Sequence, residues 1–298
     1  MIEDFLNYLR FEKAYSPHTV VSYENDLKAF EAYLLSVNSQ LCLLTADSDL
    51  VRAWAVELMA VGRNATTVNR KLSSLRSFYK YMLRVGKLDV SPMQNVQGPK
   101  KKKPLPQFVR EADMDRLLDC TLCDDSWQGV RERLVIQLFY ETGIRLSELV
   151  GLNEDDVDFA RKAIKVTGKR NKQRVIPVGD KLMAGLDEYL VKKKEVCGTG
   201  DALAPLFVTD KGVRVYPGWV YRLVRKNLSQ VVTLKKRSPH VLRHTFATAM
   251  LNGEAELEAV KELMGHKSVS TTQIYTHTTF EELKKVYSKA HPRASINQ

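Results

Sequence analysis

Cysteine is scarce in this chain, which has Cys42, Cys120, Cys123 and Cys197 among its 298 residues. A reducing compartment would leave these four side chains as free thiols. Cys120 and Cys123 have the spacing of half a zinc site, but no second pair with suitable spacing follows. We therefore expect no metal site and keep zinc binding only as an alternative.

Long hydrophobic runs are also missing, since no stretch of about 18 apolar residues exists that could cross a membrane. The first residues, Met1-Ile2-Glu3-Asp4, lack the basic and then apolar layout of a signal peptide. We therefore expect a cytoplasmic protein with no membrane partner. Apolar residues make up 44% and charged residues 27% of the chain, which is a globular composition at a length that fits roughly two domains.

Acidic residues are absent from two long segments, residues 58–88 and 211–253. The chain carries 46 Lys and Arg against 35 Asp and Glu, so its formal net charge is +11. In the first segment Arg76, Lys80 and Arg84 recur every four residues and form one stripe on a predicted helix. A basic surface on each of two domains favours a C-shaped clamp on DNA over a merely solvated basic surface. The predicted DNA-binding side chains are Arg70, Arg76, Lys80, Arg84, Arg222 and Arg225.

Helical patterns fill the first part of the chain, and we expect a helical N-terminal domain over residues 1–90. Ser16, followed by proline, marks a helix start. Asn64 can cap a further helix whose apolar positions recur at steps of three and four. Prolines and the run Lys100–Lys103 then indicate a basic, extended linker over residues 91–106.

The second predicted domain covers residues 107–298 and is mixed α/β but mostly helical. Residues 163–167 and 173–178 alternate apolar and polar side chains on either side of a polar turn, which predicts a β-hairpin. The fold class is therefore mainly α in two domains, with one small antiparallel sheet in the second.

Four segments of the second domain carry the side chains that stand out. They are Thr142-Gly143-Ile144-Arg145-Leu146-Ser147-Glu148-Leu149, the hairpin turn with Lys169, His240-Val241-Leu242-Arg243-His244, and Gly265-His266 followed nine residues later by Tyr275. Together they resemble the tyrosine recombinase (phage integrase) family, which has Arg, Lys, His-x-x-Arg, His and Tyr in this order. The resemblance covers essentially the whole chain. It implies an N-terminal core-binding, SAM-like domain and a C-terminal catalytic domain that ends in an exchange helix.

The residue types suit phosphodiester transfer, in which negative charge develops on the non-bridging oxygens of phosphorus. Arg145 and Arg243 supply planar forks that can each bind phosphate oxygens in a bidentate way. His240 lies one helical turn before Arg243, so both project from one face near a positive helix N-terminus, which favours phosphate.

The resemblance implies a role for each remaining residue. Tyr275 is the nucleophile that leaves a 3′-phosphotyrosyl bond and a free 5′-hydroxyl, and His240 accepts its proton or assists. Lys169, directly after Gly168, is our choice among the lysines and arginine of the hairpin turn for the acid that protonates the leaving 5′-oxygen. His266 donates to the scissile phosphate, and Glu148 orients an Arg or His.

Other readings of these residues are weaker. His240 and His244 have the spacing of a zinc pair, but the sequence between them lacks a Glu and places Arg243 where it would repel a cation. The acidic run Glu154, Asp155, Asp156 and Asp158 could hold Mg²⁺, yet an exposed loop explains it equally well. No phosphate-cradling G-x-x-x-x-G-K-[ST] motif occurs. We therefore expect chemistry without metal, ATP or another cofactor.

Within the family, the length and the C-terminal segments are similar to the Xer recombinases, which resolve chromosome dimers, and favour the XerC branch. The resemblance implies a specific duplex DNA site and a homo- or hetero-tetramer with a second Xer recombinase. It leaves open whether a DNA translocase activates the complex. The alternatives are an integrase or invertase of a mobile element, a type IB topoisomerase, and a protein that only binds DNA. An adduct that forms only on a specific site would distinguish the recombinases from the topoisomerase.

Overall fold

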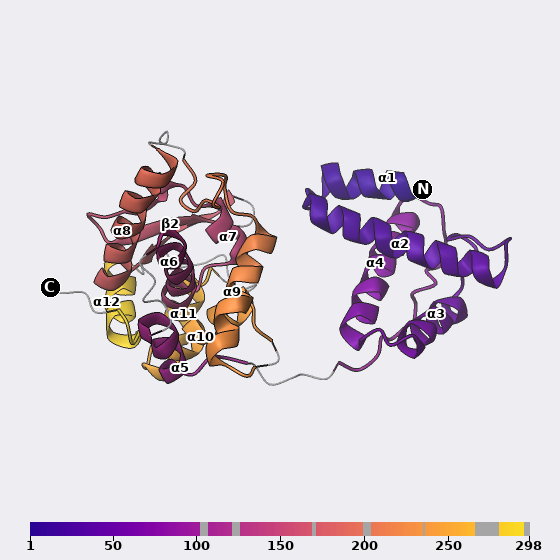
Figure 1. Ribbon diagram of the computed structural model, residues 1–298. Coiled ribbons are helices and arrows are strands. Elements are labelled where there is room, and N and C mark those ends of the chain that lie inside the picture. The colour runs from indigo at the N-terminus through magenta and orange to yellow at the C-terminus, as the bar shows by residue number, and fades with distance from the viewer. Residues whose placement is uncertain are drawn as a thin grey trace. The chain divides into compact units, whose positions relative to one another are not determined.

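The computed structural model describes residues 1–101, 107–120, 126–168, 171–198, 204–234, 236–265 and 280–294. Three predicted site residues, Lys169, His266 and Tyr275, lie outside the described residues, as does Cys123 of the half zinc site. The chain divides into two compact units, Met1–Pro104 and Leu105–Gln298, and each has its own hydrophobic core. Both units are mainly helical, which confirms the predicted fold class (Figure 1).

The first unit is built from helices that begin at the predicted capping residues. The Ser16 side chain accepts a hydrogen bond from Thr19 N at 3.3 Å, and Asn64 Oδ1 accepts one from Thr67 N at 2.8 Å. These bonds satisfy backbone donors that the first turn of a helix leaves unpaired. The elements are α1 (Ile2–Asn7), the π-helical turn η1 (Tyr8–Glu12), α2 (Pro17–Val37), α3 (Ser48–Ala60) and α4 (Ala65–Arg84).

The chain after α4 packs back on that helix. Met93 and Val96 are buried in the core of the first unit, and the Arg76 Nη2 atom donates to the Val96 carbonyl at 3.1 Å. Asn69 Nδ2 donates to the Pro99 carbonyl at 2.8 Å. Residues 91–99, which the sequence predicts as part of the linker, therefore lie against the first unit.

The second unit packs its helices around α6, which lies between α8 and α10 (Figure 1). Its elements are α5 (Glu111–Asp115), the π-helical turn η2 (Arg116–Cys120), α6 (Trp127–Thr142), α7 (Leu146–Gly151), the 3₁₀ turn η3 (Glu154–Asp156), β1 (Val157–Asp158), β2 (Ala163–Thr167), β3 (Gln173–Pro177), α8 (Asp180–Cys197), α9 (Pro217–Val231), α10 (Pro239–Asn252), α11 (Leu257–Leu263) and α12 (Phe280–Ala290).

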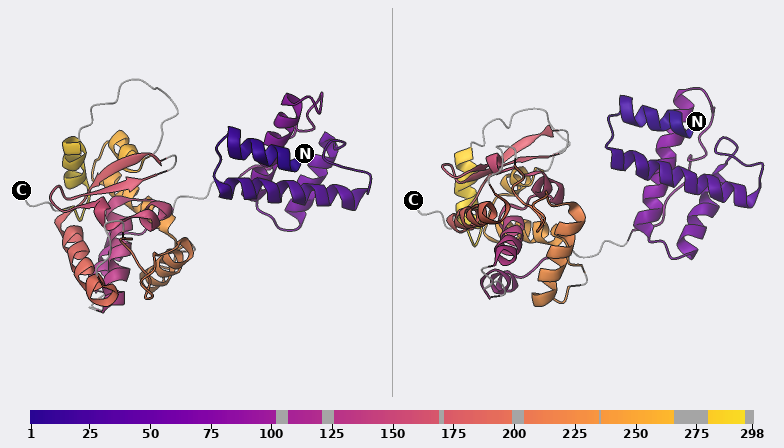
Figure 2. Two further views of the ribbon diagram at one scale, coloured as in Figure 1. Left: turned by 90° about the horizontal axis from the view of Figure 1, so that it is seen from above. Right: turned by 45° about the horizontal axis from the view of Figure 1, so that its top comes forward.

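The predicted hairpin is confirmed as β2 and β3, which pair antiparallel with Ile164 opposite Ile176 and Val166 opposite Arg174. A third strand that the sequence does not predict, β1, adds to the other edge of β2, so the order is β1-β2-β3. It has only two residues, Val157 and Asp158, so no alternation could reveal it. The sheet lies at one side of the helical body, with α12 beside β3 (Figure 2).

Two carboxylates of the acidic run, those of Glu154 and Asp156, form ion pairs with lysine side chains of the same unit. The Glu154 carboxylate accepts a hydrogen bond from Lys193 Nζ, and Asp156 pairs with Lys165 at 3.2 Å. The Asp156 carboxylate also accepts a hydrogen bond from the backbone N–H of Asn153 at the start of η3. No group of three or more His, Cys, Asp or Glu within the described residues is arranged to hold a metal ion. None of the described helices combines the length and the apolar character needed to cross a membrane.

Helix α12 packs on the unit to which it belongs. Its residues Leu283, Tyr287 and Ala290 are buried in the core of the second unit, and the Tyr287 ring stacks on His291 with centroids 5.4 Å apart. A helix is therefore present near the C-terminus, where the resemblance implies the exchange helix. Its docking on a neighbouring protomer stays a prediction.

Candidate functional site

Arg145 is positioned by a sharp turn between α6 and α7. Helix α6 ends at Gly143, whose φ of +58° is in the left-handed region that favours glycine. A Cβ atom at Gly143 would come within 2.3 Å of the Phe246 ring of α10, so only glycine allows α6 and α10 to approach this closely. Two residues later Arg145 is the N-cap of α7, and its backbone N–H donates to Glu148 Oε2 at 2.8 Å.

Helix α10 supplies His240 and Arg243 from its first turns. Ser238 is the N-cap and Pro239 follows in the first turn. His240 is exposed, whereas Arg243 is only 6% exposed. The two terminal nitrogens of Arg243 donate to the carbonyls of Gly143 and Met264. Burial, followed by the nearby positive charge of Arg145, lowers the pKa of Arg243 to about 10, so the guanidinium keeps its charge at neutral pH.

Glu148 lies beneath Arg145 with a side chain that is 1% exposed. Its Oε1 atom accepts from Arg145 Nη1 at 2.7 Å and from Arg174 Nη1 at 2.9 Å, and its Oε2 atom accepts from Arg174 Nη2 at 2.9 Å. Burial alone raises the pKa of this carboxyl, but the hydrogen bonds from Arg174 and Arg145 outweigh burial and lower the pKa to about 2. The carboxylate is therefore charged and orients both arginines.

We expect the Glu148→Gln substitution to lower the free energy of unfolding by about 3 kcal/mol at pH 7, because a pKa lowered from 4.5 to about 2 stabilises the folded state by that amount. The folded-state pKa lies below the unfolded value, so this contribution is complete above pH 4.5 and is lost as the pH falls through about 2. The difference in unfolding free energy between wild type and variant, measured in urea, should therefore shrink as the pH is lowered from about 5 towards 2.

A matched control is Glu188→Gln. The Glu188 side chain is 40% exposed and pairs with Arg133 at 3.3 Å, so its loss should cost less than about 1 kcal/mol. Equal losses in the two variants at pH 7 would contradict the assigned role of Glu148.

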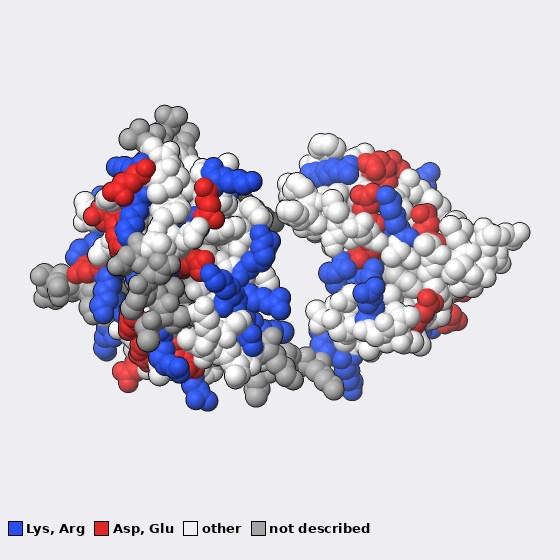
Figure 3. Space-filling view, viewed as in Figure 1, with Lys and Arg blue, Asp and Glu red and all other residues white. Residues whose placement is uncertain are grey.

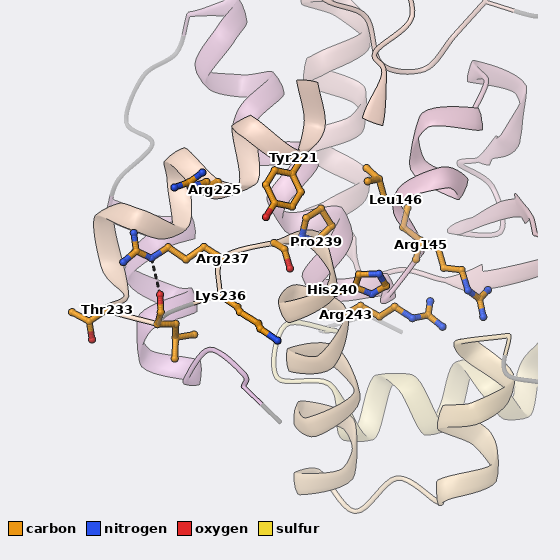
Figure 4. A pocket seen from close by; sticks show the side chains of 13 residues that line it. Arg145, Leu146, Tyr221, Arg225, Thr233, Lys236, Arg237, Pro239, His240 and Arg243 are labelled. Carbon is orange, nitrogen blue, oxygen red and sulfur yellow. Dashed lines mark hydrogen bonds between the residues drawn. The ribbon is translucent and has the colours of Figure 1, made fainter. Parts of the chain in front are cut away.

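An open pocket of about 740 Å³ lies in front of these side chains. Arg145, His240 and Arg243 meet at one end, and Arg225 and Arg237 lie at the other (Figure 4). Lys236 and Tyr221 also line the pocket. The pocket is therefore lined by five cations, counting Lys236, and one exposed imidazole, a surface suited to a polyanion.

The six predicted DNA-binding side chains differ in how they are held. Arg70 pairs with the buried Asp26, and Arg84 pairs with Glu12 at 3.1 Å. Arg222 Nη2 donates to the Tyr216 hydroxyl at 2.7 Å. For the side chains of Lys80 and Arg225, no hydrogen bond or ion pair is present within the part of the chain that the structure describes. Lys and Arg side chains gather over α4 and over α9 (Figure 3).

The structure thus brings together Arg145, Glu148, His240 and Arg243, which lie up to 98 residues apart in the sequence.

 The predicted Arg222 and Arg225 lie on α9, which lines the same pocket. Sequence reasoning missed four more side chains at this site: Arg174, Tyr221, Lys236 and Arg237.

Two sequence signals could have found some of these residues. Arg174 shares the inward face of β3 with the buried Ile176, and an arginine at an inward position of a strand calls for a buried partner. Lys236 and Arg237 belong to an acid-free segment and directly precede the cap of α10. No signal for Tyr221 is evident in the sequence.

Comparison with known proteins identifies two regions. The phage integrase family model matches residues 107–282, and the model of the phage integrase N-terminal SAM-like domain matches residues 2–86. A tyrosine recombinase XerC of Thermodesulfovibrio yellowstonii is 38% identical over 298 residues, which span 98% of this chain and 96% of the relative. A tyrosine recombinase XerC of Staphylococcus saprophyticus is 38% identical over 290 residues, which span 97% of this chain and 96% of the relative.

Solved structures share the fold. The XerH site-specific recombinase bound to its difH substrate matches with a TM-score of 0.70 at 21% identity, covering 97% of this chain and 84% of that chain. The Tn1549 transposon integrase in complex with transposon right-end DNA matches with a TM-score of 0.71 at 20% identity, covering 95% and 97% of the two chains. Similarity at this level of identity concerns the fold alone.

Proposed function

The chain belongs to the phage integrase family and, within it, to the Xer-type site-specific tyrosine recombinases, and we propose that its pocket cuts and rejoins duplex DNA. The observation that carries this proposal is the meeting of Arg145, His240 and Arg243 at one end of an open, basic pocket. Fixed cations at this point would stabilise the charge that develops on phosphate during transfer.

The scissile phosphate lies, in this proposal, against the guanidinium groups of Arg145 and Arg243. Both groups are already fixed by carbonyl acceptors and by Glu148, so little reorganisation is needed when the transition state forms. The exposed imidazole of His240 stands at the same end of the pocket and accepts the proton of the attacking hydroxyl.

The remaining steps use residues outside the described part of the chain. The Tyr275 phenolic oxygen attacks phosphorus, the bond from phosphorus to the 5′-oxygen breaks, and that oxygen takes a proton from Lys169. His266 donates a hydrogen bond to the phosphate. The energy of the phosphodiester bond is kept in the tyrosyl link, so a second 5′-hydroxyl can reverse the step without metal, ATP or another cofactor.

The experiment that tests this function uses nicked duplex DNA with candidate chromosomal recombination sites, incubated with the protein in EDTA without ATP. We expect a covalent adduct on a denaturing gel, and peptide mapping should place it at Tyr275. Formation only on a specific sequence supports a recombinase, whereas formation on any sequence would support the type IB topoisomerase. Tight binding without an adduct, also after addition of a second Xer recombinase, would contradict the proposal.

Duplex binding by each unit gives a separate prediction. Lys80 on α4 and Arg225 on α9 have no partner within the described residues, and we expect each to contact one DNA phosphate. The slope of log K against log salt is negative, and each Gln substitution should reduce its magnitude by about 1. The control Lys28→Gln removes a charge that is already paired with Glu24 at 2.6 Å and should leave the slope unchanged. Unchanged slopes in all three variants would contradict the assignment of these side chains.

We further propose that the cellular role is the resolution of chromosome dimers in the cytoplasm, on a specific duplex site. The XerC names of the relatives support this role over mobile-element integration. Partners of matching chemistry are further copies of this chain or a second Xer recombinase in a tetramer, with a DNA translocase as activator. Recombination that needs a second Xer recombinase would support the heteromeric form.

A further inference from the structure

We propose that Arg174 is a positioning residue of the cleavage site, which sets the geometry of Arg145 and of the peptide that precedes His266 in the chain. The inference rests on the proposed function. Arg174 does not line the pocket as far as the described residues show, and its side chain is 16% exposed. It therefore acts on the phosphate through its neighbours and not by direct contact.

The first neighbour is Glu148. Arg174 donates from both terminal nitrogens to the two carboxylate oxygens, each at 2.9 Å. The same two oxygens accept the side chain and the backbone N–H of Arg145, at 2.7 and 2.8 Å. The carboxylate thus has four donors around it, and the bidentate fork of Arg174 fixes its plane. Rotation of Glu148 would turn the guanidinium of Arg145 in the pocket.

The second neighbour is the end of α11. Arg174 Nε donates to the Leu263 carbonyl at 2.8 Å. Arg243 donates to the next carbonyl, that of Met264, at 2.6 Å, and Arg145 donates to the one after it, that of Gly265, at 2.9 Å. Three arginines therefore bind three successive carbonyls, and His266 is the next residue of the chain.

Gly265 shows how closely Arg174 approaches this segment. The φ of Gly265 is +63°, and a Cβ atom there would lie 3.0 Å from Arg174 Nη1. The guanidinium thus packs directly beneath the peptide, and the segment has little room to shift while Arg174 is in place.

Charge gives a second reason for Arg174. A buried Glu148 carboxylate beside Arg145 would cancel the positive charge that Arg145 offers to phosphate. With Arg174 on the other side of the carboxylate, the group of three side chains carries a net charge of about +1. The substitution Arg174→Met would therefore both free Glu148 to rotate and weaken the field at the phosphate.

The test measures single-turnover cleavage of the nicked duplex by the full chain, as a function of DNA concentration. For Arg174→Met we expect the cleavage rate constant at saturating DNA to fall by about 100-fold. The half-saturating DNA concentration should change by less than about threefold, because Arg174 does not face the pocket. Arg174→Lys keeps the charge but not the fork, so it should remain at least about tenfold below wild type.

The amplitude of the reaction separates positioning from stability. A purely structural role would lower the amplitude, which reports the folded fraction, and leave the rate constant of the remaining protein unchanged. That result, or a wild-type rate constant in Arg174→Lys, would overturn the inference. The matched control is Arg161→Met in the turn between β1 and β2, whose side chain is 80% exposed and whose loss should leave rate and amplitude unchanged. If wild type itself forms no adduct, the proposed function fails instead.

Discussion

Tyr275→Phe is expected to bind the nicked duplex as tightly as wild type and to form no covalent adduct. The substitution removes only the phenolic oxygen, which is the atom that would become bonded to phosphorus. It changes no charge, so the electrostatic part of DNA binding stays the same. A mobility-shift titration and a denaturing gel on the same samples measure the two quantities.

The structure provides sharp controls for this experiment, because it places other tyrosines of the second unit. Tyr287 is fully buried in the hydrophobic core, and burial raises the pKa of its hydroxyl. Tyr287→Phe should therefore cleave at the wild-type rate. Tyr221 is 44% exposed and lines the pocket, so it is the competing candidate for the nucleophile.

The comparison between Tyr275 and Tyr221 decides the assignment. We expect Tyr221→Phe to keep the adduct, since the family pattern ends at Tyr275. An adduct that persists in Tyr275→Phe and disappears in Tyr221→Phe would show that the pocket uses a different nucleophile. Peptide mapping of the wild-type adduct gives an independent answer to the same question.

The elements that sequence analysis predicted well are those with local causes. A cap such as Ser16 or Asn64 bonds to a backbone N–H three residues away, so its signal lies within one short stretch of sequence. The β2 and β3 hairpin likewise depends on alternation and on one turn. The two-residue strand β1 has no such local pattern, because it forms only by pairing with β2.

The sequence predicted which residue types form the candidate site, but not the hydrogen bonds and ion pairs that hold them in place. The family pattern names Arg145, His240 and Arg243, but nothing in it shows what holds them. Arg174 meets Glu148 across 26 residues and Leu263 across 89. Such contacts depend on how β3, α7 and α11 pack together. That packing cannot be predicted from local patterns in a single sequence. The roles of Lys169, His266 and Tyr275 stay predictions.

Arg243→Gln is expected to lower the single-turnover cleavage rate constant by on the order of 10³-fold, as for the loss of a fixed donor or arginine at a transferring phosphate. Arg243 also ties Gly143 and Met264 to α10 through its two carbonyl bonds. The variant therefore loses stability as well as a cation. The rate constant of the folded fraction is the quantity that isolates the effect on catalysis.

Arg131→Gln is the control that separates these two losses. Arg131 is 2% exposed, and it donates to the Val208 carbonyl at 3.0 Å and to Asp210 at 2.7 Å. It is therefore a buried, carbonyl-bound arginine that does not line the pocket. Both variants should unfold at lower urea concentration than wild type, because each leaves buried acceptors unpaired. Only Arg243→Gln should show a lower cleavage rate constant for its folded fraction. Equal rate constants in the two variants would mean that Arg243 holds the fold together and does not act on the phosphate.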